Sequence, residues 1–242
     1  SFSLLNVFSQ NGELAVDFSR YGTAITGASY INRTVVKDLI HEIERINRSK
    51  TPEEINEAIL NSIEGTPFMN NEFAEGELFT VDDKKIEKVF LRFNVYNSKM
   101  EVKYNESLFE LSEKLIKKVK IDDKTFEYLP YEISGKQHSG YLELIEDGEW
   151  KLYCYHSKKF KEGQPQKAMQ DKPSPPEFRD LPSVYLLMKN KDDRAIGFKN
   201  KKELVNMFSN NKSEINAFIK KHKLKHNDPE DLKELMAYYN TH

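Results

Sequence analysis

The pattern of apolar and polar residues divides the chain into a helical start, a long stretch of strands and a helical end. Between Thr34 and Ile63 the apolar residues recur every three to four positions, which is the period of one helix face. Thr51-Pro52-Glu53-Glu54 supplies an N-cap, a proline at the first helical position and a capping-box glutamate. The sequence therefore predicts helices over residues 34–46 and 51–63.

After Thr66-Pro67 the apolar residues alternate with polar ones, which is the period of a β-strand. Turn-forming Asp, Asn, Ser and Gly residues separate short apolar runs at a spacing typical of an antiparallel meander. The expected strands include Met100–Tyr104, Thr125–Tyr128, Tyr141–Ile145, Trp150–Tyr155, Val184–Met188 and Ala195–Phe198. Asp147-Gly148 predicts a tight hairpin with a type I′ turn, in which both central residues have positive φ.

Residues 161–182 are rich in proline, and this density predicts a long extended loop without a strand or helix. The prolines in this segment are Pro165, Pro173, Pro175, Pro176 and Pro182. Beyond it the apolar spacing becomes helical again. Three short helices are expected, around residues 204–208, around residues 215–219 and from the Asp228-Pro229 start onward.

Together these patterns predict an α+β fold. It consists of N-terminal helices, a central antiparallel β-meander (a sheet or barrel-like), and a C-terminal cluster of about three short helices. The expected domain organisation is a signal-peptide remnant at 1–9, an irregular and helical segment at 10–64, an antiparallel β domain at 65–198 with its proline-rich loop at 161–182, and a helical segment packed on it at 199–242.

The first nine residues carry no charge. Val7 and Ser9 occupy the −3 and −1 positions of a secretory cleavage site before Gln10, and a basic segment would precede Ser1 in such a signal. This predicts a signal-peptide remnant outside the folded protein. The alternative is an ordinary N-terminal strand that packs Leu4, Leu5, Val7 and Phe8.

Composition narrows the function classes. Lys and Arg number 37 against 39 Asp and Glu, a formal net charge of −2, which removes bulk electrostatics as a reason to bind nucleic acid or an anionic membrane. One cysteine excludes an internal disulfide framework and a multi-thiolate metal site. No run approaches the ~18 apolar residues of a spanning helix, so no transmembrane segment is expected in the mature chain.

Candidate chemistry is sparse. Cys154 and His156 share one face of an expected strand and could form a nucleophile and its base, but apolar neighbours favour core packing. His222 and His226 have the spacing of two helical metal ligands, but no third ligand is nearby, which favours a solvated helix end.

The charged runs also have ordinary explanations. Lysines at 220–225 suit the last turn of a helix, and no aromatic residues interleave with them to stack on bases. The pairs Asp82-Asp83, Asp122-Asp123 and Asp192-Asp193 fit turns, and the calcium-loop pattern is missing. We therefore predict no catalytic, cofactor-binding or metal-ligating residue and no cofactor.

Several blocks carry a family resemblance when they are taken together in order and spacing. They include Gly65-Thr-Pro-Phe-Met-Asn-Asn-Glu-Phe73, Leu91-Arg-Phe-Asn-Val-Tyr-Asn97, Gly148-Glu-Trp-Lys-Leu-Tyr153 and Glu230-Asp-Leu-Lys-Glu-Leu-Met-Ala-Tyr-Tyr-Asn240. The other blocks are Met100-Glu-Val, Gly140-Tyr-Leu-Glu-Leu, Asn200-Lys-Lys-Glu-Leu-Val and Phe218-Ile-Lys-Lys-His-Lys-Leu-Lys. Over residues 50–242 the chain resembles a group of uncharacterised exported proteins of flavobacteria and related Bacteroidota. The resemblance implies export and a bacterial envelope setting, and it transfers no catalytic residue.

The expected function is that of an exported, non-enzymatic binding or cell-envelope-associated module. Its location would be periplasmic, outer-membrane-associated or secreted, and its partner a protein or envelope component. The proline-rich loop offers a place where such a partner can dock. The alternative is a small exported hydrolase whose site is assembled from distant residues.

Overall fold

The computed structural model describes residues 18–24, 63–104, 107–163, 174–208 and 211–241. Of these residues 49% lie in strands and 19% in helices. The strands are β1 (Gly22–Ala24), β2 (Ala74–Thr80), β3 (Lys85–Asn94), β4 (Lys99–Tyr104), β5 (Ser107–Leu111), β6 (Ile116–Ile121), β7 (Lys124–Ile133), β8 (Lys136–Glu146), β9 (Trp150–Tyr155), β10 (Lys158–Lys161), β11 (Glu177–Asp180), β12 (Val184–Lys189) and β13 (Ala195–Gly197). The helices are a 3-10 turn, η1 (Phe18–Arg20), and α3 (Lys201–Met207), α4 (Lys212–His222) and α5 (Pro229–Asn240).

Five strands close into a barrel in the order β7-β13-β12-β9-β8, with β8 paired back to β7. Four of the five pairings are antiparallel. The fifth joins β13 to β7 in parallel, with Ala195 opposite Tyr131, and this pairing closes the ring. The long β7–β8 hairpin turns at Ser134-Gly135, whose φ angles of 58° and 77° are those of a type I′ turn.

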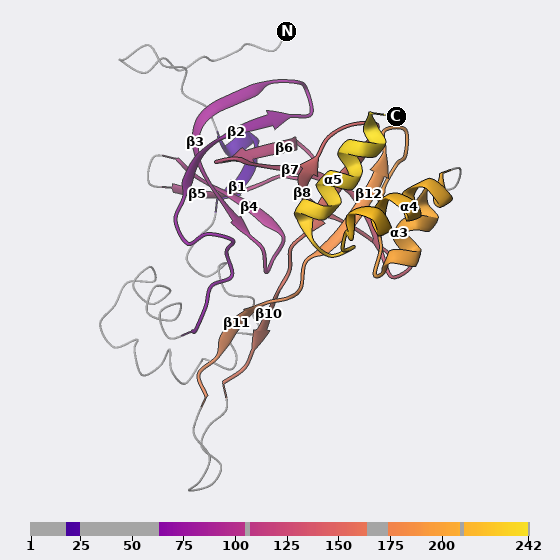
Figure 1. Cartoon of the computed structure of the whole chain (residues 1–242). Coiled ribbons are helices and arrows are strands. Elements are labelled where there is room, and N and C mark those ends of the chain that lie inside the picture. Colours follow the sequence, from indigo (N-terminus) through magenta and orange to yellow (C-terminus); the bar gives the residue numbers. More distant parts are fainter. Residues whose placement is uncertain (1–17, 25–62, 105–106, 164–173, 209–210, 242) are drawn as a thin grey trace, which may run out of the picture.

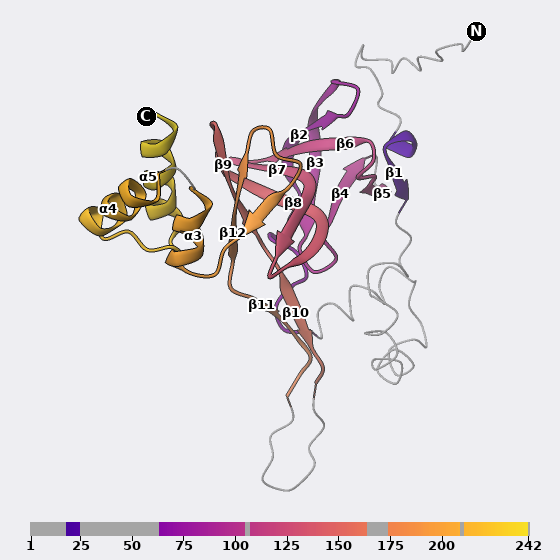
Figure 2. The ribbon, with the colours of Figure 1, turned by 90° about the vertical axis from the view of Figure 1, so that its right-hand side faces the viewer.

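A second, curved layer of strands extends from β7 in the order β6-β2-β3-β4-β5-β1. Figure 2 shows this layer on one side of the barrel and helices α3, α4 and α5 on the other. The barrel wall therefore separates two cores on its outside from a third core within it.

The period of two in the strands explains the three cores, because successive side chains point to opposite faces. Leu142 and Tyr153 point into the barrel with Tyr131, Leu186 and Ala195, and these side chains fill it. Outward-facing residues of β7 and β8 such as Phe126 and Tyr141 pack under the curved layer. Outward-facing residues of β9 and β12 pack under the helices.

The strands β10 and β11 form a separate two-stranded sheet, which we call the arm. The arm projects from the barrel body in both views (Figures 1 and 2). Phe160 lies opposite Phe178 in it, with ring centroids 5.1 Å apart, and Phe178 also packs on Tyr96 of the β3–β4 loop. Glu64 bonds to the outer edge of β11 through Pro176 and Phe178, which anchors the base of the arm.

Three predictions from the sequence are wrong. The fold is not an α+β meander: the described chain is mostly β, with a closed barrel and further strands, because the parallel pairing of β13 with β7 turns a meander into a ring. Residues 161–182 are not strandless, since they include β11 (Glu177–Asp180). Gly148 is not among the residues with positive φ, so its hairpin is not of type I′.

Other predictions concern residues outside those described. They are the signal-peptide remnant at 1–9, the strand alternative there, the helix over 34–46 and the helix over 51–63 up to residue 62. The three C-terminal helices are present as α3, α4 and α5. Asn200 caps α3 and Asp228 caps α5, with Pro229 at the start of the latter, which is the capping chemistry that the sequence indicates.

Candidate functional site

A buried polar cluster lies where the two outer cores meet. Its centre is Glu143 on β8, which stands opposite Phe126 of β7 on one side and Cys154 of β9 on the other. One oxygen of Glu143, Oε2, lies 2.5 Å from Nε2 of His156, and Oε1 accepts a hydrogen bond of 2.5 Å from Nζ of Lys124. Both carboxylate oxygens are thus engaged, and the side chain is 8% exposed.

The electrostatics of this cluster favour its charged form. Burial by itself would lower the pKa of His156, but hydrogen bonding to Cys154 and Glu143 outweighs burial and raises that pKa to about 9. Burial likewise opposes the charge on Glu143, yet the hydrogen bonds from His156 and Lys124 hold its pKa below the usual value. At neutral pH His156 is therefore an imidazolium beside the carboxylate of Glu143.

The thiol of Cys154 also belongs to this cluster, but the side chain is buried. It is 3% exposed, and it packs with Tyr185 and Leu187 under the helices, so the prediction of a core cysteine is confirmed. Thiol, imidazole and carboxylate stand in the order that nucleophilic catalysis uses. With the sulfur enclosed, this arrangement serves to hold the strands together and has no open approach for a substrate.

Sequence reasoning identified Cys154 and His156 but missed Glu143 and Lys124. Glu143 lies in the apolar run Tyr141-Leu-Glu-Leu-Ile145, and a carboxylate within such a run signals a buried partner. The identity of that partner depends on the register of β8 with β9, which the sequence does not contain.

A second polar centre surrounds Arg92 on β3. Its Nε and Nη2 donate to Oε2 of Glu101, at 3.2 and 2.8 Å, and Nη1 donates to the carbonyl of Asn71 at 3.0 Å. The guanidinium also lies over two rings, 3.5 Å from the centroid of Phe68 and 4.2 Å from that of Phe73. Arg92 therefore fixes the segment before β2 onto the curved layer by charge, hydrogen bonds and cation–π contact.

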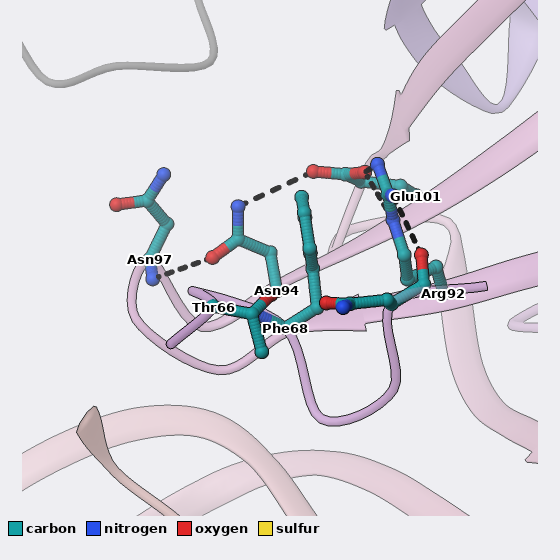
Figure 3. Close-up of polar contacts among 7 residues, drawn as sticks. Thr66, Phe68, Arg92, Asn94, Asn97 and Glu101 are labelled. Atoms are coloured by element: carbon teal, nitrogen blue, oxygen red, sulfur yellow. Dashed lines mark hydrogen bonds and ion pairs between the residues drawn. The ribbon is translucent and has the colours of Figure 1, made fainter. Parts of the chain in front are cut away.

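Asn94 completes this centre (Figure 3). Its Nδ2 donates to Oε1 of Glu101 at 3.3 Å, and its Oδ1 accepts from the backbone N–H of Asn97 at 3.1 Å. Burial raises the pKa of Glu101 even though Arg92 and Asn94 favour its charged form. Beside Arg92 is a hollow lined in part by Met69, Asn70, Glu72, Asp123 and Lys124, and Lys124 also belongs to the Glu143 cluster.

The two histidines near the C-terminal end do not form a metal pair. Helix α4 ends at His222, and Lys223 adopts the left-handed conformation with φ 58°, so His226 lies beyond the helix. Nδ1 of His222 is 2.6 Å from Glu234 of α5. Across the described ranges, no group of three or more His, Cys, Asp or Glu side chains is arranged to hold a metal ion.

An aromatic stack lies beside the C-terminal lysines and includes His222. Phe218 stacks on His222 at 4.2 Å and on Tyr238 at 4.0 Å. Because Phe218 lies between the other two rings, both of its faces are occupied, and the stack joins α4 to α5.

Within the described part of the chain, no helix has the length and apolar character needed to cross a membrane. Comparisons of the chain with protein-family models, with curated proteins and with solved structures gave no match.

Proposed function

We propose that this chain is an exported, non-enzymatic binding module of a bacterial cell envelope, and that the arm is its recognition element. The observation that carries this proposal is the projection of the preformed arm from a barrel whose interior is filled. Binding residues are often placed on projecting segments that a rigid scaffold positions.

The base of the arm supports a recognition role because it is already ordered. The backbone N–H of Leu181 bonds to the carbonyl of Ser157 at 2.9 Å, directly before the first arm pair. Glu64 donates to Pro176 at 2.9 Å and accepts from Phe178 at 2.8 Å. A preformed element avoids part of the ordering cost that a flexible segment meets on binding.

The alternative, an exported hydrolase, has weaker support in the described residues. The thiol–imidazole–carboxylate arrangement is the closest approach to catalytic chemistry, and its sulfur is buried under the helices. The barrel axis offers no room either, since Tyr131, Tyr153 and Leu186 occupy it. A binding function needs only an exposed surface element, and the arm is one.

Removal of the arm tests the proposal. Ser157 and Leu181 are hydrogen-bonded neighbours, so a two-residue Asn-Gly turn in place of residues 158–180 can join them without moving β9 or β12. Wild-type and armless proteins are labelled and their retention on the envelope fraction of the native cell is measured. We expect retention of the wild type and a loss of about tenfold or more without the arm.

The matched control keeps the arm and alters the helices on the other side. Replacing the exposed Lys202 on α3 by Ala is expected to leave retention unchanged. If the armless protein folds and is retained as well as the wild type, the arm is not the recognition element. Turnover of peptide, ester or glycoside substrates by the wild type would favour the hydrolase instead.

A further inference from the structure

The outer edge of β10 has backbone groups directed away from the arm. Ser157 and Leu181 form a hydrogen-bonded pair, and such pairs alternate with non-hydrogen-bonded ones along an antiparallel ladder. Lys158 and Phe160 therefore occupy non-hydrogen-bonded positions opposite Asp180 and Phe178. Their N–H and C=O groups point away from β11, and in the described part of the chain no strand pairs with them.

The outer edge of β11 is different, since Glu64 already bonds to it. The N–H of Phe178 donates to Glu64, and the carbonyl of Pro176 accepts from it, as the same alternation requires. The arm thus has one blocked edge and one edge whose groups match an incoming extended chain. Addition of a strand to an exposed edge is a recurrent mode of peptide recognition.

The side chains along β10 are basic. Lys158, Lys159 and Lys161 flank Phe160, and Lys159 stands directly opposite Arg179. Like charges directly opposite each other destabilise a strand pair. The carboxylate of Glu177 serves both Arg179 at 2.5 Å and Lys161 at 3.1 Å, while Lys159 has no ion pair among the described residues.

We infer that the edge of β10 binds an extended, acidic segment of a partner protein by strand addition. The inference rests on the proposed function and names its partner class. Backbone pairing with Lys158 and Phe160 supplies affinity, and acidic side chains of the added strand lie next to Lys159 and Lys161. The incoming charges relieve the repulsion between Lys159 and Arg179.

The same features disfavour two other occupants. A second copy of this chain pairing edge to edge through β10 would bring Lys158, Lys159 and Lys161 against their own equivalents, and lysines on an edge are a known guard against such pairing. An anionic membrane would pair with the lysine charges but would leave the backbone N–H and C=O groups of the β10 edge without hydrogen bonds.

The test uses capped hexapeptides with the full-length protein, measured by isothermal titration calorimetry. The acidic probe is Thr-Glu-Val-Glu-Val-Thr, and its matched control is Thr-Lys-Val-Lys-Val-Thr. We expect binding of the acidic probe and at least about tenfold weaker binding of the basic one. An acidic probe that is N-methylated at alternate residues keeps its charge but loses the backbone N–H groups that would donate to β10. We expect it to bind about tenfold more weakly than the unmethylated acidic probe.

Two variants test the edge from the side of the protein. Lys158→Pro removes an outward N–H at the first residue of β10, where proline is tolerated, and Lys158→Ala keeps that N–H. Both variants lose the ion pair between Lys158 and Asp180, so their difference reports the N–H. We expect the proline variant to bind the acidic probe about tenfold more weakly than the alanine variant. Lys159→Glu is expected to weaken the same probe by about fivefold.

Several results would overturn the inference. They are equal binding of the acidic and basic probes, no loss on N-methylation, or no detectable binding of the acidic probe by folded wild-type protein. Because the N-methylated probe leaves the protein unchanged, the test survives if Lys158→Pro does not fold. If the probes fail while the armless protein still loses envelope retention, only this inference falls and the proposed function stands.

Discussion

At the scale of single residues, two buried tyrosine hydroxyls differ in whether they have a hydrogen-bond partner. The hydroxyl of Tyr153 donates to Oε2 of Glu127 at 2.6 Å inside the barrel, and Lys151 lies 3.8 Å from that oxygen. The hydroxyl of Tyr141, on the outer face of β8, is buried with no hydrogen-bond partner among the described residues. The two tyrosines are equally enclosed, so they form a matched pair for measuring what a buried hydroxyl contributes.

Removing each hydroxyl should have opposite consequences. Tyr153→Phe breaks a bond to a carboxylate and is expected to lower the free energy of unfolding by about 1–2 kcal/mol. Tyr141→Phe removes an unsatisfied polar atom and should leave stability within about 0.5 kcal/mol or raise it. Urea unfolding of both variants measures this; an equal loss in the two would mean that the Tyr141 hydroxyl has a partner.

The Glu143 cluster predicts a stability that falls in alkali. The pKa of His156 is raised to about 9 in the folded protein, above the ordinary histidine value near 6.5. A raised pKa contributes stability that is complete below the unfolded value and is lost as pH rises through the folded value. We expect a loss of about 2 kcal/mol between pH 6.5 and 9, measured by denaturant unfolding.

A variant isolates the contribution of this histidine. His156→Gln keeps a hydrogen-bonding side chain beside Glu143 but does not titrate, so the loss between pH 6.5 and 9 should largely disappear. An unchanged pH slope in His156→Gln would show that the imidazole is not the titrating group.

At the scale of elements, helix α5 is fastened to the barrel through its last residue. Oδ1 of Asn240 accepts from the N–H of Trp150 at 3.0 Å, and Nδ2 donates to the Trp150 carbonyl at 3.2 Å. Gly148 allows this approach, because a Cβ there would lie 2.1 Å from Nδ2 of Asn240. The glycine of the β8–β9 hairpin is therefore explained by contact with a helix rather than by positive φ.

A double-mutant cycle checks this contact. Asn240→Ala should lower the free energy of unfolding by about 1–2 kcal/mol, since it removes two hydrogen bonds. Gly148→Ala should be clearly destabilising in the wild type and much less so in the Asn240→Ala background. Additive effects of the two changes, measured by denaturant unfolding, would contradict the proposed clash.

The strands themselves follow from the sequence, but the way they assemble does not. The spacing predicted β4, β9, β12 and the C-terminal helices, because alternation and capping are local properties. The Asp-Gly dipeptide predicts the type I′ turn at Asp147-Gly148, yet the hairpin with positive φ at both positions is Ser134-Gly135. A turn dipeptide alone does not indicate why it contains glycine. The glycine can be required for a positive φ, or it can leave room for a residue that is distant in the sequence.

At the scale of the whole molecule, closure of the barrel depends on one long-range pairing. Ala195 and Ile196 of β13 pair in parallel with Tyr131 and Glu132 of β7. Three residues of strand leave no periodic signal that names their partner. The same limitation applies to the candidate site, since Lys124, Glu143 and His156 come together only when β7, β8 and β9 are placed in register.

The arm gives the molecule its asymmetry, with a filled barrel between two outer layers and one projecting ribbon. The proline-rich composition of residues 161–182 indicates a segment outside the core, but it does not predict the strand at Glu177–Asp180. Pro175 and Pro176 precede that strand rather than interrupt it, so the ladder keeps its donors.

We propose that recognition belongs to the arm and not to the barrel or the helices. Hydrogen–deuterium exchange of the intact protein, with and without the envelope fraction of its native cell, tests this most directly. We expect slower exchange in fragments covering residues 157–161, where the edge amides of β10 lie. Unchanged exchange in the arm together with protection around Arg92, the Glu143 cluster or helices α3 to α5 would contradict it.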